Sequence, residues 1–288
     1  MQSPDLASLF VSTPTAARRD RSRVIARVAL TAVALGFLGV VVVLPVLAVF
    51  AKAFEDGVLA YLRAVIEADA LAAMRLTLWI ALLVVPANTV FGLAAGWAIG
   101  KFEFRGKTLL TALIEVPFAV SPVISGLIFV LAVGPHSALG SRLLESGIRV
   151  IFAWPGMALA TAFVTFGYVA RQVITVMETT GRDKEEAALV LGASGWQTFW
   201  RVSLPSIRWG LLYGVILCNA RAMGEFGGVS VVSGHVRGLT NTLPLYVETL
   251  YDDYRFSASF AVASLLVFLA VVTLIAKVLV EPKIGVPS

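Results

Sequence analysis

Long stretches without a single charged residue are the feature that most restricts how this chain folds. Residues 28–50, 76–100, 150–170 and 256–276 are four such stretches. Each exceeds or matches the ~20 residues that an α-helix needs to cross the hydrocarbon core of a membrane. With 58% hydrophobic and only 14% charged residues, the composition excludes a soluble globular protein. The runs are continuously apolar and do not alternate, so they predict helices and not the strands of a membrane barrel.

Two weaker apolar segments raise the expected number of spans to six. Residues 116–134 carry Pro117 and Pro122 near their start, and we expect these prolines to break the helix near the cytoplasmic face. Residues 209–230 are interrupted by two charges, Arg221 and Glu225. The prediction is an all-α polytopic membrane protein with one six-helix domain over residues 24–280. Disordered or short cytoplasmic tails are expected at 1–23 and 281–288.

The distribution of Lys and Arg predicts how the spans are oriented. If the N-terminus is cytoplasmic, fifteen of the 23 basic residues fall in cytoplasmic segments and seven in external ones. Cytoplasmic loops carry the excess of positive charge in membrane proteins. We therefore expect both termini, and the loop over residues 178–206, on the cytoplasmic side of a bacterial inner membrane.

The loop over residues 178–206 has the pattern of two short helices. Acidic residues open the first helix, where they complement the helix dipole, and Gly192 is expected to end it in a tight bend. Trp196, Phe199 and Trp200 fall on one side of the second helix, which we expect Pro205 to end. From shape alone, the loop fits a protein-docking element and an amphipathic hairpin on the lipid surface equally well.

A longer motif favours docking. The residues Glu186-Ala187-Ala188, a three-residue gap, Gly192, a nine-residue gap, then Val202-x-Leu204-Pro205 resemble the signature loop of bacterial ABC importer permeases, with Val202 where the family usually has Ile. The resemblance implies the type I ABC importer fold and a loop that couples to a separate ATPase. The implied ATPase-coupling residues are Glu186, Ala187, Ala188, Gly192, Ala193, Leu204 and Pro205.

The chain itself has no GxxxxGK[ST] phosphate loop. We therefore expect no enzymatic activity and no cofactor on this chain, with ATP and Mg bound by the partner ATPase.

Other segments narrow the resemblance to oxyanion importers. Residues 116–123 and 219–227 look like the third and fifth spans of sulfate and molybdate permeases, and residues 230–238 and 242–245 are similar to the W-type permease of sulfate/thiosulfate importers. This likeness implies three partners: a homologous T-type permease, two copies of a sulfate ATPase, and a periplasmic sulfate- or thiosulfate-binding protein. No nucleic acid or metal is expected. A molybdate or tungstate permease is the nearest alternative.

Two groups of residues within the spans are candidates for specific roles, one in the anion path and one in helix packing. Arg221 and Glu225 are spaced to pair on one helix face. With Asn219 and Gly224 they are candidates for an anion path or gate, and a purely structural ion pair is the competing interpretation. Gly92, Gly96 and Gly100 form a tandem GxxxG pattern, for which close helix packing is the expected role.

Two other classes of protein explain less of the sequence. An ion-coupled secondary transporter would account for the spans and the intramembrane charges but not for the loop. An intramembrane enzyme would need a nucleophile with a nearby base or a metal cluster, and we find neither pattern.

Overall fold

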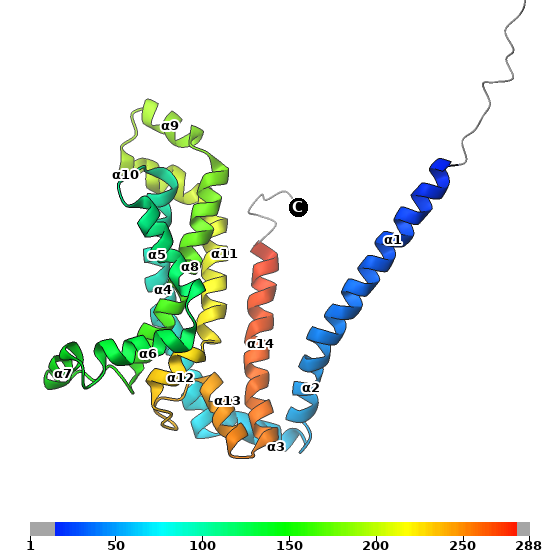
Figure 1. Ribbon diagram of the computed structural model, residues 1–288, viewed down its shortest axis with the longest axis vertical. Helices are drawn as coiled ribbons and strands as arrows, with labels where there is room; N and C mark the ends of the chain where they lie inside the picture. The colour runs from blue at the N-terminus through cyan, green and yellow to red at the C-terminus, as the bar shows by residue number, and fades with distance from the viewer. Residues whose placement is uncertain (1–14, 281–288) are drawn as a thin grey trace, which may run out of the picture. The chain divides into compact units, whose positions relative to one another are not determined.

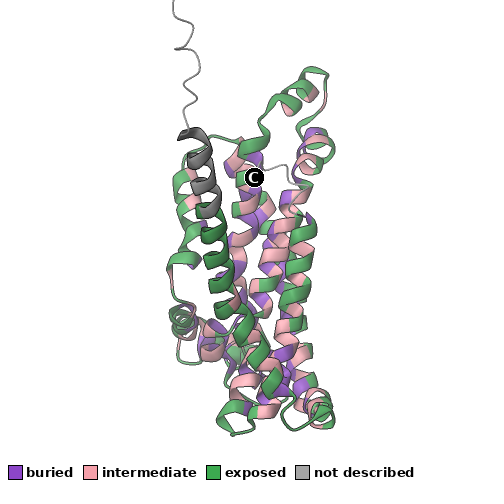
Figure 2. Cartoon of the chain, turned by 90° about the vertical axis from the view of Figure 1, so that its right-hand side faces the viewer, coloured by how far each residue is buried: buried purple, intermediate pink, exposed green. Residues whose placement is uncertain are grey.

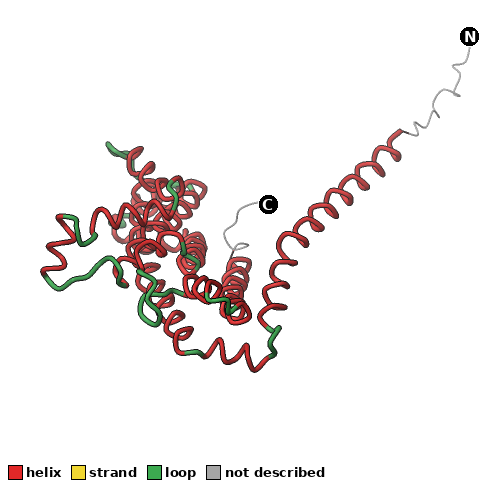
Figure 3. Tube along the Cα trace, turned by 60° about the horizontal axis from the view of Figure 1, so that its bottom comes forward, coloured by secondary structure: helices red, strands yellow, loops and turns green. Residues whose placement is uncertain are grey.

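The computed structural model describes the backbone of residues 15–280 and the side chains of residues 26–280. Regular structure there is entirely helical, as predicted (Figure 3). The tail expected at 1–23 is in fact helical from Thr15; residues 1–14 and the tail at 281–288 lie outside the described residues. In chain order the elements are α1 (Thr15–Leu38), π-helix η2 (Gly39–Val43), α2 (Leu44–Ala53), α3 (Val58–Ile66), α4 (Ala68–Lys101), α5 (Lys107–Ala119), α6 (Pro122–Val133), α7 (Ala138–Glu145), α8 (Trp154–Thr180), α9 (Asp183–Val190), α10 (Gly195–Thr198), π-helix η3 (Phe199–Ser203), α11 (Leu204–Met223), α12 (Gly227–Ser233), α13 (Leu243–Asp252) and α14 (Phe256–Val280) (Figure 1).

The chain divides into two compact units, Met1–Ala51 and Lys52–Ser288. Most of the described part of the first unit lies in one apolar helical segment, Ala26–Ala53, which runs from α1 through η2 and ends with α2 just after the unit boundary. No residue in its most apolar window is buried. A helix that is apolar on every side needs lipid or another protein around it, so this segment has the character of a membrane span.

Both π-helical segments end two residues before a proline. η2 precedes Pro45 and η3 precedes Pro205. A proline inside an α-helix lacks the N–H donor and clashes with the carbonyl four residues earlier, and a wider π turn relieves that clash. This corrects our expectation for Pro205: it does not end a helix, because Gly195–Met223 is one continuous helical segment.

The second unit is built around α8, against which α4 and α11 pack through glycines. An ideal Cβ atom placed on any of the three glycines of the α4 GxxxG pattern would lie 2.6–2.9 Å from a side-chain atom of α8. Only a residue without a side chain permits so close an approach. The facing pairs are Gly92 with Val169, Gly96 with Val173 and Gly100 with Met177. Residue numbers rise together along both helices, so α4 and α8 run parallel.

The parallel course of α4 and α8 requires the chain to return across the unit between them. The return begins in α5 and is bent by 110° before α6. Ser121 adopts an extended backbone (ψ 134°), as a residue before proline does, and Pro122 then starts α6. Our expected span over 116–134 is therefore wrong in its bounds, since the helix begins at Lys107 and breaks after Ala119.

The fifth expected span, 209–230, is also broken. α11 ends at Met223, and α12 leaves at an angle of 48° from Gly227 onward. Within the described residues, four helical segments are long and apolar enough to cross a membrane alone, and the number is six if each bent pair counts as one span. Counted in that way, the spans equal the six expected from the sequence.

Buried residues gather where helices of the second unit pack on one another (Figure 2). One apolar cluster joins α4 and α8 to α12, and another joins α4 and α8 to α11. Between these clusters, buried Asn88 donates hydrogen bonds to the Ala162 carbonyl and to Thr165 Oγ1 at 3.1 and 2.8 Å. These bonds satisfy the donor of an amide that would be costly to bury alone.

Ion pairs join the helices at the end of the second unit opposite α9 and α10 (Figure 1). Arg255, before α14, pairs with Glu67, before α4, at 2.8 Å. The hydrogen bond from Arg255 lowers the pKa of the Glu67 carboxyl below its ordinary value. Arg237 and Asp253 form a second pair beside it. These contacts fix the loops between the spans at this end.

Candidate functional site

The loop between α8 and α11 forms one end of the second unit (Figure 1). Its first helix, α9, carries Asp183, Glu185 and Glu186 in its first turn. It ends at Gly192, whose φ of +87° is a left-handed backbone conformation that favours glycine. The N–H of Gly192 donates to the Leu189 carbonyl and the N–H of Ala193 to the Ala188 carbonyl, both at 3.0 Å. This is a Schellman motif, and it is the bend expected at Gly192.

The second helix of the loop starts with a capping box. The N–H of Gln197 donates to Ser194 Oγ at 3.3 Å, and the N–H of Ser194 donates to Gln197 Oε1 at 2.9 Å. The S-x-x-Q pattern at residues 194–197 is the sequence signal for this cap, which the prediction of the loop did not include. Because the cap fixes where α10 begins, it sets the direction in which the adjoining tryptophans point.

The tip of the loop presents apolar side chains to its surroundings. Val190 and Leu191 are 88% and 86% exposed, and Leu189, Trp196 and Trp200 are also exposed. So many exposed large apolar side chains on one short loop indicate a surface that another protein or a membrane covers. Phe199 differs from its two aromatic neighbours because it is buried, with its ring centroid 4.7 Å from that of Trp97 in α4.

The signature residues themselves lie mostly at the surface. Glu186, Ala187, Gly192 and Pro205 are exposed, whereas Ala188, Ala193 and Leu204 are partly buried.

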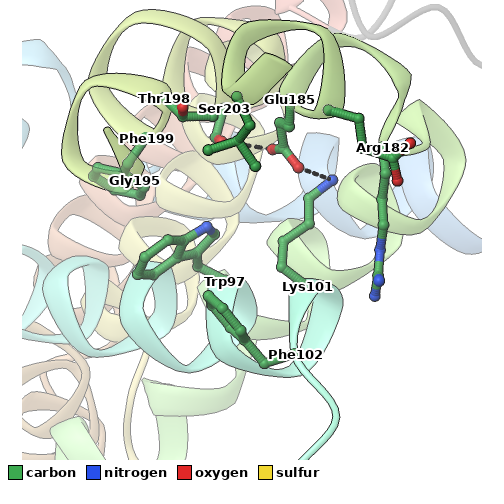
Figure 4. A pocket seen from close by; sticks show the side chains of 11 residues that line it. Trp97, Lys101, Phe102, Arg182, Glu185, Gly195, Thr198, Phe199 and Ser203 are labelled. Atoms are coloured by element: carbon green, nitrogen blue, oxygen red, sulfur yellow. Dashed lines mark hydrogen bonds and ion pairs between the residues drawn. The ribbon is translucent and has the colours of Figure 1, made fainter. Parts of the chain in front are cut away.

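Glu185, immediately before the signature, makes the polar contacts that attach α9 to the helix bundle (Figure 4). Its Oε2 atom lies 3.0 Å from Lys101 Nζ, and its Oε1 atom accepts a hydrogen bond of 2.5 Å from Ser203 Oγ. Lys101 also donates to the Gly181 carbonyl at 2.8 Å. Sequence reasoning missed these residues, because a lysine at the end of an apolar run is ordinarily an interfacial charge.

A hollow of about 300 Å³ separates α9 from the end of α4 (Figure 4). Trp97 and Phe102 line one side of it, and Arg182 and Glu186 line another. The Lys101–Glu185 pair crosses this region. α9 therefore contacts the bundle across a partly empty space.

Arg221 and Glu225 form a close pair at the bend between α11 and α12. Arg221 Nη1 lies 2.6 Å from Glu225 Oε2, although the geometry there is not that of a hydrogen bond, so we treat the contact as an ion pair. Glu225 Oε1 accepts a hydrogen bond of 2.8 Å from the N–H of Gly228. The Glu225 side chain is 1% exposed and that of Arg221 31%. The carboxylate thus holds the start of α12 while the guanidinium reaches open space.

The other two residues of the candidate anion path, Asn219 and Gly224, do not take part in this ion pair. Asn219 contacts the sulfur of its helix neighbour Met223 at 3.7 Å. Gly224 is exposed and opens on a hollow of about 260 Å³ beside α14. The structure thus brings Arg221 and Glu225 together and leaves Asn219 without a contact to either.

Comparison with known proteins places the chain in a family. The family described as "Binding-protein-dependent transport system inner membrane component" matches residues 88–286, well over half of the chain. The chain belongs to this family. It is 49% identical over 257 residues to the "Sulfate transport system permease protein CysW" of Synechococcus elongatus, covering 89% of this chain and 90% of that protein. It is 47% identical to the protein of the same name from Escherichia coli K12, covering 84% and 83%.

A second kind of family member is more distant. The "Sulfate transport system permease protein CysT" of Escherichia coli K12 is 32% identical, over 80% of this chain and 83% of that protein. The difference in identity places the chain with the W-type permeases of the family and not with the T-type.

A solved structure of the family's architecture supports the fold. A bacterial ABC transporter involved in the import of alginate aligns with a TM-score of 0.75, covering 92% of this chain and 98% of that one. Its sequence is 16% identical, so the likeness concerns the fold alone. As a family member with several apolar helices, the chain is a multi-pass inner-membrane protein.

Proposed function

We propose that this chain is the W-type permease subunit of an ATP-driven ABC importer that carries sulfate or thiosulfate into the cell. The observation that carries the proposal is the 47–50% identity to sulfate permeases over 84–90% of the chain. The chain is a non-catalytic membrane subunit, and a separate ATPase subunit hydrolyses ATP.

The loop between α8 and α11 docks on that ATPase. Its exposed tip combines apolar side chains with the exposed carboxylates of Asp183 and Glu186. The signature residues named above lie beside this tip and contact the ATPase in the proposal. ATP and Mg bind the partner, because this chain lacks a phosphate loop.

Arg221 offers positive potential to the anion at the bend between α11 and α12. An arginine in a membrane span is costly unless it faces protein, water or a counter-charge. Glu225 is such a counter-charge, and the partial exposure of Arg221 leaves its other donors free to face a path. Asn219 and Gly224 adjoin the same bend.

The assembled importer contains further chains. A homologous T-type permease, two ATPase copies and a periplasmic sulfate- or thiosulfate-binding protein complete it. Both termini of this chain lie in the cytoplasm with the docking loop, in agreement with the excess of basic residues in those segments.

A reconstituted complex tests this function and its substrate. The chain is purified with its T-type partner and ATPase, and ATP hydrolysis is measured with binding proteins loaded with sulfate, thiosulfate, molybdate or tungstate. We expect sulfate- or thiosulfate-loaded protein to stimulate hydrolysis. Stimulation by molybdate- or tungstate-loaded protein alone would reassign the substrate, and an active complex without a T-type partner would refute the heteromeric assembly.

A further inference from the structure

The polar side-chain contacts that attach α9 to the helix bundle come from one residue. None of the eight residues of α9 is buried, and the hollow of about 300 Å³ lies beneath it. Among the described side chains, each hydrogen bond or ion pair that links an α9 side chain to another element is made by Glu185. A movement of α9 is therefore transmitted to the bundle by the Glu185 side chain and by the backbone at both ends of the helix.

Glu185 connects α9 to three other parts of the unit. Lys101, the last residue of α4, pairs with one carboxylate oxygen and also binds the carbonyl of Gly181, in the turn after α8. Ser203, the last residue of η3, binds the other oxygen. We call Lys101, Glu185, Ser203 and the Gly181 carbonyl the Glu185 network.

The surroundings of the network make it stiff. The side chains of Lys101 and Glu185 are only 8% and 17% exposed, so water screens their attraction weakly. Charge-assisted hydrogen bonds are short and fix both distance and direction, whereas apolar contacts are non-directional and allow helices to slide. The network therefore holds α9 at a defined position relative to α4 and η3.

We propose that the Glu185 network is the mechanical link that transmits movement of the ATPase-bound loop to the membrane helices. This inference rests on the proposed function. Glu185, Lys101 and Ser203 are positioning residues in it, since they act through α9 and not on the anion. They lie outside the residues that the signature loop assigns to ATPase contact.

The elements beyond the network extend the link into the membrane. Ser203 adjoins α11, a helix of 20 residues that spans ~30 Å and ends two residues after Arg221. Lys101 ends α4, whose glycines pack directly on α8. A shift of Glu185 thus reaches the bend between α11 and α12 through one continuous helix, and it reaches α8 through close backbone contact.

The test compares transport with ATP consumption in the complete importer. Vesicles containing the chain, its T-type partner, the ATPase and the sulfate-binding protein are assayed for sulfate uptake and ATP hydrolysis together. For Glu185→Gln and Lys101→Met we expect unchanged subunit yield and unchanged basal hydrolysis. Sulfate carried per ATP should fall about tenfold in both variants, because each removes the ion pair that joins α9 to α4.

A matched control and one milder variant show whether the effect is specific to the Glu185 network. Lys107 and Glu103 form another Lys–Glu pair at the same end of the unit, with Glu103 exposed and the two atoms 2.7 Å apart. Glu103→Gln should leave sulfate per ATP unchanged. Ser203→Ala, which removes one hydrogen bond, should lower the ratio partially.

Each outcome decides the inference. A wild-type ratio in Glu185→Gln, or an equal loss in Glu103→Gln, would overturn it. Loss of ATPase copurification in Ser203→Ala would also overturn it, because the network would then serve docking. Failure of the wild-type complex to take up sulfate with ATP would instead refute the proposed function.

Discussion

The backbone conformation at position 192 and the side-chain partners at position 225 explain why Gly192 and Glu225 occupy these positions. Gly192 has a positive φ and no neighbouring atom within 4 Å of a Cβ position, so the backbone and not the available space restricts it. Glu225 is fully buried and uses its two carboxylate oxygens for different partners, the Gly228 N–H and Arg221. Substitutions can therefore test the left-handed backbone of Gly192 and the ion pair of Glu225 independently.

Substitutions at Gly192 should separate backbone strain from bulk. Gly192→Glu should abolish sulfate uptake while membrane insertion continues, because the left-handed residue becomes strained and a charge enters the docking surface. Gly192→Asn should retain much of the uptake, since asparagine tolerates that conformation. Uptake is measured together with protein level in the membrane. Wild-type transport by Gly192→Glu would mean that this loop does not couple ATP hydrolysis to transport.

The ion pair between Arg221 and Glu225 is best tested by removing both charges, and not by exchanging the two residues. Exchanging the two residues would put an arginine where Gly228 needs an acceptor, so the exchange cannot isolate the charge. The double substitution Arg221→Met with Glu225→Gln removes both charges and keeps an amide oxygen for Gly228. Replacing a whole buried pair is often neutral, so we expect a thermal stability near that of the wild type.

Sulfate uptake should nevertheless fall in this double variant. If Arg221 attracts the anion, losing a charge-assisted contact worth ~1.5 kcal/mol lowers the uptake rate by about tenfold. Thermal unfolding and uptake are measured on the same preparation. Full uptake with normal stability would assign the pair a structural role only.

At the scale of elements, the packing of α4 on α8 depends on glycine. Gly96→Val should destabilise the protein by ~1–3 kcal/mol, the usual cost of forcing extra atoms into a packed interface. Its position allows no relief, because a Cβ would lie 2.6 Å from Val173 Cγ1. Gly36→Val is the matched control, as no atom lies within 4 Å of a Cβ there. Equal melting temperatures for the two variants would contradict this account of the α4–α8 interface.

The sequence predicted those elements that depend on local signals. The long apolar runs predicted the all-helical membrane fold, and Gly192 predicted its own bend because a Schellman motif needs only neighbouring residues. The predicted start of the third span, residue 116, was wrong. A charged residue, Glu115, comes directly before it and interrupts the apolar run, whereas in the structure Glu115 is an exposed residue within α5. The η3 turn follows from Pro205, a local signal that we interpreted as a helix end and not as a π turn. The pairing of Lys101 with Glu185, 84 positions later in the sequence, depends on a tertiary contact.

At the scale of the whole molecule, the second unit connects the loop between α8 and α11 to the charged pair at the bend between α11 and α12. The docking loop and the Glu185 network lie at one end, and helix α11 leads from there to the charged pair at its bend. The chain's relatives are permeases of sulfate transport systems, and the chain contains no ATP site by sequence. The central claim is that ATP hydrolysis by a partner drives sulfate through this subunit.

The most direct measurement of that claim is labelled sulfate uptake by vesicles that hold the complete importer, with the binding protein outside and ATP inside. We predict uptake that requires both ATP and this chain, and that continues after ionophores collapse all ion gradients. Uptake that proceeds without ATP and stops when the ion gradients collapse would contradict the account and identify a secondary transporter.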